Sequence, residues 1–303
     1  MRFMINVKGV VKSFDGFRAL NMLDMNVEKG SIYGLVGPNG AGKTTIINHI
    51  TGALTPDSGI ITVDGESVYD NEKIKQRVLS IADDWYYYGS FTAGDMARFY
   101  KRIYNNFNAE RYMRMAELFS IDEKRQIRRL SKGMKKQVAF HLTLSCMPDV
   151  LILDEPLDGL DPVMRKQILN LIINDVSERG MTVLVSSHNL RELEDICDHV
   201  GIIHRGSMII EKPLDDLKGS VHKYQVVLNG DIPESLYKKL NILHSSKIGS
   251  VHNLIIKGVP EEINYAIKEL NPLICENISL TLEEVFIYEL GGLGYDFKGI
   301  IVQ

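Results

Sequence analysis

A glycine-rich stretch in the N-terminal part of the chain combines residue types that bind phosphate. Its nine residues are Gly37, Pro38, Asn39, Gly40, Ala41, Gly42, Lys43, Thr44 and Thr45. They fit the pattern G-x-x-x-x-G-K-[ST], in which glycines let backbone N–H groups turn toward phosphate oxygens. In that pattern Lys43 would reach the β- and γ-phosphates, and the Thr44 hydroxyl would hold Mg²⁺. The stretch therefore predicts a binding site for a nucleotide.

The segments on either side of the glycine loop support this prediction. Residues 31–36 are short and mostly apolar, which is typical of a buried strand, and residues 44–50 have the pattern of a helix. A strand, a glycine loop and a helix follow one another in a phosphate-binding loop, and the helix N-terminus adds partial positive charge. A glycine-rich turn that matches by chance is the alternative, and the flanking elements favour the phosphate site.

Two further apolar runs end in side chains that could act on a nucleotide. Residues 150–153 read as a buried strand that ends in Asp154 and Glu155. Ligands of open α/β sheets lie at the carboxyl ends of the strands, so Asp154 fits a carboxylate that organises Mg²⁺. Glu155 fits a general base that orients or deprotonates an attacking water. Residues 181–187 read as the next buried strand, and His188 at its end is a candidate for a γ-phosphate contact, although a lone histidine is usually structural.

Three other features are ambiguous by sequence alone. Phe14 could stack on an adenine ring or belong to the core, and its position alone favours the core. The basic residues 124–136 could bind nucleic acid, but a solvated helix face is the favoured interpretation; within them Ser131 and Gly133 open a helix whose N–H groups could meet an anion. The aromatic loop of residues 85–91 is equally compatible with buried packing and with an exposed interface.

The element pattern predicts an α/β protein with a second, smaller domain. Residues 5–27 read as antiparallel strands around a turn at Asp15 and Gly16, and residues 92–147 read as a helical insertion. A boundary is expected at residues 217–220. The order of strands and helices over residues 221–290 is βαββαβ with one added helix, which is the order of a ferredoxin-like domain. Residues 291–303 form a glycine-rich tail.

Composition limits the class of protein. A length of 303 residues suggests two domains, and 45% hydrophobic with 24% charged residues is ordinary for a globular protein. A net charge of −4 gives no general attraction to nucleic acid or anionic lipid. Cys146, Cys197 and Cys275 match no metal or redox spacing, which predicts reduced, mostly buried cysteines in a cytoplasmic protein.

The chain contains no expected membrane segment. Residues 1–8 are too short and too soon charged for a signal peptide, and no window approaches about 20 apolar residues. If the protein works at a membrane, another chain is expected to supply the membrane part.

Taken together, these motifs resemble the ATP-binding subunit of an ABC transporter. Over about residues 4–218 they occur in the family's order: Walker A at residues 37–45, the signature at 130–134, Walker B with its glutamate at 151–155, the D-loop at 160–161 and the H-loop at His188. Phe14 falls where the family has its adenine-stacking aromatic residue, which favours that role. Residues 280–286 resemble the tail of the ABC-2-type export subfamily.

The resemblance implies a fold and a mechanism. The fold would be a P-loop NTPase core with an antiparallel β subdomain and the helical insertion. Two ATP-binding domains would dimerise head to tail, so that Ser131 and Gly133 bind the γ-phosphate of ATP held by the partner and Asp161 crosses the interface. Glu155 would polarise the water, and His188 would contact the γ-phosphate. Closure of the dimer would move a permease docked near residues 85–91, from Trp85 to Phe91.

The sequence departs from the family pattern at two places. The family usually has glutamine at the end of the strand after Walker A, where it contacts Mg²⁺ and water, and that position is Asp83 here. The signature has Lys132 for glycine and Met134 for glutamine. Since Ser131 and Gly133 remain, and Glu155 and His188 are present, we expect phosphate binding and an active ATPase.

The main hypothesis is therefore an ATP- and Mg²⁺-dependent subunit of a membrane exporter, cytoplasmic and peripheral on the inner face of the cell membrane. Its partners would be an integral-membrane permease and a second ATP-binding subunit, either another copy or a paralogue, with no nucleic acid expected. The alternative is a soluble ABC-type ATPase of translation or DNA maintenance. Such proteins usually fuse two ATPase domains or contain long coiled coils, and this chain shows neither. A carbohydrate-binding C-terminal domain is less favoured than the ferredoxin-like one.

Overall fold

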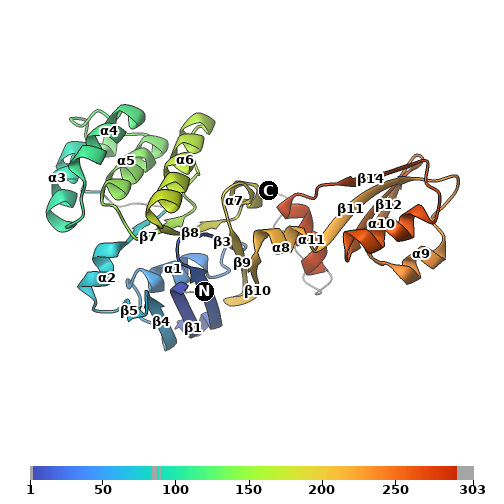
Figure 1. The fold of residues 1–303 in the computed structure, drawn as a ribbon. Helices are drawn as coiled ribbons and strands as arrows, with labels where there is room; N and C mark the ends of the chain where they lie inside the picture. The colour runs from blue at the N-terminus through green and yellow to red at the C-terminus, as the bar shows by residue number, and fades with distance from the viewer. Residues whose placement is uncertain (1–2, 84–86, 89, 292–303) are drawn as a thin grey trace. The chain divides into compact units, whose positions relative to one another are not determined.

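The computed structural model describes residues 3–83, 87–88 and 90–291 (Figure 1). The chain forms two compact units. The first contains Met1–His188 and Ile196–Glu211, and the second contains Asn189–Asp195 and Lys212–Gln303. The nucleotide-binding motifs lie in the first unit.

An antiparallel sheet begins the first unit, as predicted. Its strands in the order β2-β1-β4-β5 are β1 (Phe3–Phe14), β2 (Phe17–Glu28), β4 (Ser58–Val63) and β5 (Glu66–Ser67). The predicted turn joins β1 to β2, and both of its residues have positive φ angles, 46° at Asp15 and 84° at Gly16. Two left-handed residues in a two-residue turn match the twist of the flanking strands, so this sequence favours a tight hairpin.

The second sheet of the first unit positions the chemistry. Its order is β10-β9-β3-β8-β7-β6, and its strands are β3 (Ile32–Val36), β6 (Val78–Ile81), β7 (Val150–Asp154), β8 (Thr182–Ser187), β9 (His199–His204) and β10 (Ser207–Pro213). The pairs β3–β8, β8–β7, β7–β6 and β3–β9 are parallel. Every residue of β3, β7 and β8 is buried, which explains why apolar residues follow one another in these strands instead of alternating with polar ones. Parallel pairing places the ends of these strands at one edge of the sheet.

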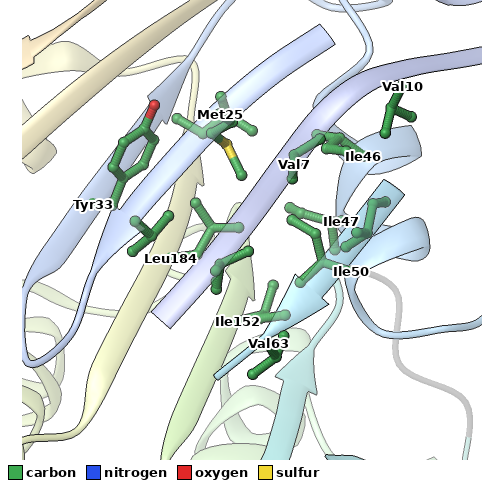
Figure 2. Close-up of a cluster of buried hydrophobic side chains, with 14 of the residues drawn as sticks. Val7, Val10, Met25, Tyr33, Ile46, Ile47, Ile50, Val63, Ile152 and Leu184 are labelled. Atoms are coloured by element: carbon green, nitrogen blue, oxygen red, sulfur yellow. The ribbon is translucent and has the colours of Figure 1, made fainter. Parts of the chain in front are cut away.

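A hydrophobic core fixes the helix that follows the glycine loop. Helix α1 (Lys43–Ile50) has only eight residues, too few to be stable in isolation. Its Ile46 and Ile50 are fully buried in a cluster with Val7 of β1 and Ile152 of β7 (Figure 2). Burial of each such side chain contributes roughly 1.5–3 kcal/mol, so packing rather than helix propensity holds the helix beneath the loop.

The predicted helical insertion contains three helices with polar caps. They are α3 (Ala93–Ile103), α4 (Ala109–Phe119) and α5 (Lys132–Ser145), with a 3₁₀ turn η1 (Ile127–Arg129) before α5. Met96 and Tyr100 of α3 pack against Val138 and Leu142 of α5 in one core. Helix α2 (Glu72–Arg77), which the sequence analysis did not predict, precedes β6, and α6 (Pro162–Arg179) connects β7 to β8.

The second unit contains an antiparallel sheet in the order β12-β13-β11-β14. Its elements follow the predicted βαββαβ order: β11 (Val221–Val227), α9 (Glu234–Lys239), β12 (Asn241–Ile248), β13 (Val251–Lys257), α10 (Pro260–Lys268) and β14 (Ile274–Ile278). Tyr224 and Leu254 of the sheet share a core with Ile263 and Ile267 of α10. The helices therefore cover an apolar face that the strand alternation creates.

Three more helices belong to the second unit. They are α7 (Leu190–Glu194), α8 (Leu214–Lys218) and α11 (Leu282–Gly291). Glu194 of α7 accepts a hydrogen bond from the Leu282 N–H at 3.1 Å and pairs with Lys218 of α8 at 2.7 Å. These contacts join α7, α8 and α11 within the second unit, of which Lys212–Gln303 is the longer part. A domain boundary at residues 217–220 stays a prediction.

Candidate functional site

A pocket of about 410 Å³ lies where the ends of β6 and β7 meet the glycine loop, within the size range of small-molecule sites. The residues that line it come from the β1–β2 hairpin, the glycine loop and the ends of the two strands. They are Phe14, Phe17, Ala19, Pro38, Asn39, Gly40, Gly42, Lys43, Thr44, Thr45, Asp83, Asp154 and Glu155. The pocket thus brings together most of the residues that the sequence predicts for nucleotide and metal binding. Gly37 and Ala41 belong to the same loop without lining the pocket.

The glycines of the loop are required by their surroundings. Gly42 has a φ of 112°, and a side chain there would place Cβ 2.9 Å from the Ala19 carbonyl oxygen. A Cβ at Gly37 would lie 2.4 Å from the Ile203 carbonyl oxygen. The loop therefore passes directly against neighbouring backbone, which only glycine permits.

Lys43 is the buried cation of the pocket. Its Nζ donates a hydrogen bond to the Gly37 carbonyl at 2.7 Å and lies 3.5 Å from Glu155 Oε1. A buried ammonium group needs such partners because it has left water. Lys43 starts α1, so its charge and the helix N-terminus both favour an anion in this pocket.

Asp154 is the buried carboxylate at the end of β7. Thr44 Oγ1 donates to its Oδ2 at 2.7 Å, and the Ser186 hydroxyl of β8 donates to its Oδ1. The sequence analysis missed Ser186, although its place one residue before the end of the neighbouring parallel strand was a signal. Thr44 and Asp154, two of the three residues predicted to hold Mg²⁺, are therefore in direct contact.

Glu155 is held at its main chain and its side chain. It has a φ of 47°, a left-handed conformation that is uncommon for a residue other than glycine. Its N–H donates to the Ser186 carbonyl at 3.2 Å, and its Oε2 lies 2.9 Å from His188 Nδ1. His188 does not line the pocket, but it contacts the glutamate that does. A carboxylate beside an imidazole can orient a water and pass on its proton.

Asp83 lies at the edge of the pocket with two lysines of α5. Lys132 Nζ and Lys136 Nζ are each 3.3 Å from Asp83 Oδ1. Partial burial raises the pKa of this carboxyl group, but the charges and hydrogen bonds of Lys136 and Lys132 outweigh it and lower the pKa below its usual value. Asp83 is thus an ionised carboxylate within reach of the glycine-loop pocket. Neither lysine contact was predicted.

Two aromatic side chains form the outer wall of the pocket. Phe14 is 42% exposed, and Phe17, which faces it directly across the β1–β2 hairpin, is 66% exposed. Phe14 is therefore not a core residue. The sequence analysis missed Phe17, although the register of the predicted hairpin places it on the same face as Phe14. Such exposed rings offer a flat surface on which an adenine base can stack.

Ser131, Gly133 and Asp161 do not line this pocket. The Ser131 hydroxyl accepts a hydrogen bond from the Met134 N–H at 3.3 Å and caps α5. Asp161 Oδ1 accepts hydrogen bonds from the Val163 and Met164 N–H groups at 3.1 and 3.0 Å and caps α6. Both capping residues are exposed. Gly133 passes close to another segment, because a Cβ there would lie 2.5 Å from the Gly159 carbonyl oxygen.

The predicted docking loop is described only in part, since Trp85, Tyr86 and Gly89 lie outside the described residues. Tyr87 packs against the helical core, and its hydroxyl donates to the Lys135 carbonyl at 2.8 Å. Tyr88 is 50% exposed, and its ring centroid lies 4.9 Å from that of Phe91. The described part of the loop thus combines buried packing with an exposed ring.

Comparisons with known proteins agree with this geometry. The family model described as ABC transporter matches residues 20–158. The ABC transporter ATP-binding protein YtrB of Bacillus subtilis is 32% identical over 289 residues, which is 95% of this chain and 99% of that protein. The chain belongs to the ABC transporter ATP-binding proteins. The family suggested by the motifs is thereby confirmed, and so is the predicted ABC ATPase core of the fold.

Two further comparisons support the same family. The bacitracin transport ATP-binding protein BcrA of Bacillus licheniformis is 36% identical over 227 residues, 74% of each chain. A solved ATP-binding subunit of an ABC transporter superposes with a TM-score of 0.67 at 27% identity, over 71% of this chain and 92% of that one.

As a member of this family, the chain is an ATP-binding and ATP-hydrolysing subunit of a transporter. The soluble alternative in translation or DNA maintenance finds no support in these relatives. In the part of the chain that the structure describes, no helix has both the length and the apolar character of a membrane span.

Proposed function

We propose that this ABC transporter subunit holds ATP in the glycine-loop pocket and completes the site with a second ATP-binding subunit. The observation that carries the proposal is the division of the predicted site residues. Lys43, Thr44, Asp154 and Glu155 share one pocket, whereas Ser131, Gly133 and Asp161 do not line it. A second subunit, placed head to tail, would bring its own Ser131 to the open side of the ATP.

Within the pocket each residue has a role that its contacts support. Lys43 exchanges its Gly37 carbonyl partner for β- and γ-phosphate oxygens, which are stronger partners because they are charged. The Phe14 ring stacks on the adenine. Glu155 orients the attacking water and accepts its proton. His188 holds the Glu155 carboxylate through its Nδ1 and contacts the γ-phosphate.

Thr44 and Asp154 are the residues that would hold Mg²⁺, with Asp83 as a third oxygen ligand. Mg²⁺ usually takes one or two protein carboxylates and completes its shell with phosphate oxygens and water, so this sparse set of oxygens fits it. Among the described residues, no group of three or more His, Cys, Asp or Glu side chains forms a metal site of its own. When bound with ATP, the ion would neutralise charge on the phosphates.

The subunit would power an integral-membrane permease of the ABC-2 export type from the cytoplasmic face of the membrane. The bacitracin transport protein among the relatives supports the export class without identifying the substrate here. The loop of residues 85–91 would meet the permease, and the exposed Tyr88 ring is the described residue that suits such a contact. The second subunit could be another copy or a paralogue.

The test is the variant Glu155→Gln, which keeps the shape of the side chain but removes the base. ATP turnover should fall by about 10²–10⁴-fold, the usual contribution of a general base. ATP should then hold the variant as a dimer, detected by size-exclusion chromatography with and without ATP. Glu178→Gln, an exposed carboxylate of α6, is the matched control. Unchanged turnover of Glu155→Gln would overturn the assignment, and an ATP-bound monomer would overturn the shared site.

A further inference from the structure

A buried lysine in the helix that begins at the signature connects two parts of the site. Lys136 of α5 is 4% exposed, although lysine is almost never buried without a partner. Its Nζ donates a hydrogen bond to the Glu155 carbonyl oxygen at 2.6 Å and lies 3.3 Å from Asp83 Oδ1. One ammonium group thus contacts the residues that follow β6 and β7.

The contact with Glu155 is made where the backbone is unusual. Glu155 adopts a left-handed conformation, with a φ of 47°. Ser186 holds its N–H, and Lys136 holds its carbonyl oxygen. These two hydrogen bonds fix the peptide groups on both sides of the Glu155 Cα atom. They therefore set the direction in which its carboxylate enters the pocket.

Lys132, one turn earlier on the same helix, provides an internal comparison. Its Nζ lies at the same 3.3 Å from the same Asp83 oxygen, but its side chain is 57% exposed, and the hydrogen bond to the Glu155 carbonyl oxygen comes from Lys136 instead. The side chain of Lys136 is only 5% exposed. The two lysines therefore share the Asp83 ion pair and differ in the bond to the Glu155 main chain.

We propose that Lys136 is a positioning residue for ATP hydrolysis. It fixes the position of the Glu155 main chain relative to the Asp83 carboxylate. This inference rests on the proposed role of Glu155. Lys136 does not line the ATP pocket, so it acts through Glu155 rather than on the nucleotide. Because Ser131 caps the same helix, the element that meets the partner's ATP also supports this subunit's own catalytic carboxylate.

The experiment compares Lys136→Met, Lys136→Gln and Lys132→Met in the full-length protein. Methionine keeps the length of the side chain and removes the donor, whereas glutamine keeps an N–H donor without the charge. For each variant, kcat, KM and the Kd for ATP of the isolated subunit are measured, together with the ATP-dependent dimer. A displacement of about 1 Å in a catalytic group can reduce the rate about 100-fold.

We expect Lys136→Met to lower kcat by about 100-fold, to leave the Kd for ATP within about twofold and to accumulate the ATP-bound dimer. Lys136→Gln should recover part of the lost rate, because it can still donate to the Glu155 carbonyl oxygen. Lys132→Met, which loses the other ion pair of Asp83 but leaves the bond to the Glu155 main chain, should lower kcat less than Lys136→Met does.

Equal losses in Lys136→Met and Lys132→Met would overturn the proposal, because only the shared ion pair would then matter. A parallel loss of ATP affinity in Lys136→Met would also overturn it, since that indicates general structural damage. If Lys136→Met does not fold, Lys136→Gln decides, with lower kcat and unchanged Kd supporting the proposal and unchanged kcat rejecting it. Glu155→Gln in the same assay tests the proposed function separately, because its turnover does not depend on the Lys136 result.

Discussion

Two groups of polar residues in the first unit are held in contrasting ways. At the edge of the parallel sheet, Lys43, Asp154 and Glu155 are partners or neighbours of one another around a single pocket. At the starts of α5 and α6, Ser131 and Asp161 bond only to the N–H groups of their own helices in the contacts described above. The first group is assembled by tertiary packing, whereas the second is assembled by local capping.

The difference supports the proposal that one chain carries half of a site shared by two subunits. Lys43 and Asp154 of the strand-edge group are buried, Glu155 is half-buried, and all three are already held by neighbouring groups. The helix-cap residues are exposed and bonded locally, so under the proposed function they are free to meet the ATP of a second subunit. Loss of the phosphate-binding cation Lys43 from the strand-edge group should therefore change ATP affinity in the isolated subunit, and variants in the helix-cap group should not.

The largest effect is expected at Lys43. Lys43→Ala removes the buried cation, and hydrogen bonds to charged groups contribute about 1.5–3 kcal/mol each, so the affinity for ATP should fall by about 100-fold or more. Isothermal titration calorimetry of the isolated subunit with ATP measures this affinity. Lys29→Ala, at an exposed position between β2 and β3, is the control. If Lys43→Ala changes the affinity for ATP by less than about threefold, the strand-edge group does not determine ATP binding.

A variant of Gly133, two residues after Ser131 at the start of α5, tests the helix-cap group. In Gly133→Ala the new Cβ would lie 2.5 Å from the Gly159 carbonyl oxygen, so the start of α5 must shift away from the segment before Asp161. We expect turnover to fall by about 10- to 100-fold, because small displacements of binding groups are costly. The Kd for ATP of the isolated subunit should stay within about twofold. Weaker ATP binding by the isolated subunit would contradict the distinction between the strand-edge and helix-cap groups.

The effect expected at Phe14 is smaller and concerns only the affinity for ATP. Aromatic stacking is worth about 0.5–1.5 kcal/mol, so Phe14→Ala should weaken ATP binding by about fivefold. Competition with GTP would show whether the ring selects the base. Phe3→Ala is the matched control, because Phe3 is a similarly exposed phenylalanine of the same strand that does not line the pocket. Equal losses in both variants would remove Phe14 from the site.

The smallest effect concerns stability and its dependence on pH. His141 of α5 stacks on Tyr112 with ring centroids 4.1 Å apart, and its Nε2 lies 2.7 Å from the Tyr112 carbonyl oxygen. Burial lowers the pKa of His141 from its ordinary value of 6.5, although the Tyr112 carbonyl and Glu123 oppose the change. The unfolded chain therefore binds this proton more readily, and the contribution is present above pH 6.5 and is lost as the pH falls below it.

The variant His141→Phe should lose this part of the pH dependence. Below about pH 6.5, the free energy of unfolding should fall less steeply than in the wild type, by at most about 1.4 kcal/mol per pH unit. Urea unfolding at pH 7.5 and pH 5.5 measures the difference. ATP affinity at pH 7.5 should not change, since His141 lies outside the pocket. Identical slopes for the two proteins would contradict the expectation.

Much of the fold and of the strand-edge site could be predicted from local patterns. The glycine loop lies between β3 and α1, and Asp154 and Glu155 stand at the end of β7. Both positions could be predicted because buried parallel strands are largely apolar and their carboxyl ends lie at one edge of the sheet. Helix α2 was missed because it has only six residues and one buried side chain. Helix α7 was assigned to the second unit by its contacts with Lys218 and Leu282, which no local pattern encodes.

The remaining members of the site depend on contacts between distant segments. Phe17 reaches the pocket through the register of a hairpin, Ser186 through the pairing of β8 with β7, and Lys136 through the packing of α5. Their residue types carry no motif of their own. Asp83 was predicted as an oxygen ligand, but its pairing with Lys132 and Lys136 joins two departures from the family pattern that the sequence shows only separately.

The sequence by itself determined which chemistry this protein carries, because glycines, lysine, threonine and carboxylates at set spacings are readable wherever a strand turns into a helix. Only the tertiary structure decided how those groups are supported and which of them share a pocket. The physical reason is that motif residues need only their immediate neighbours to be recognised. The contacts that orient Glu155 join β7, β8 and α5, and these come together only when the apolar core is buried.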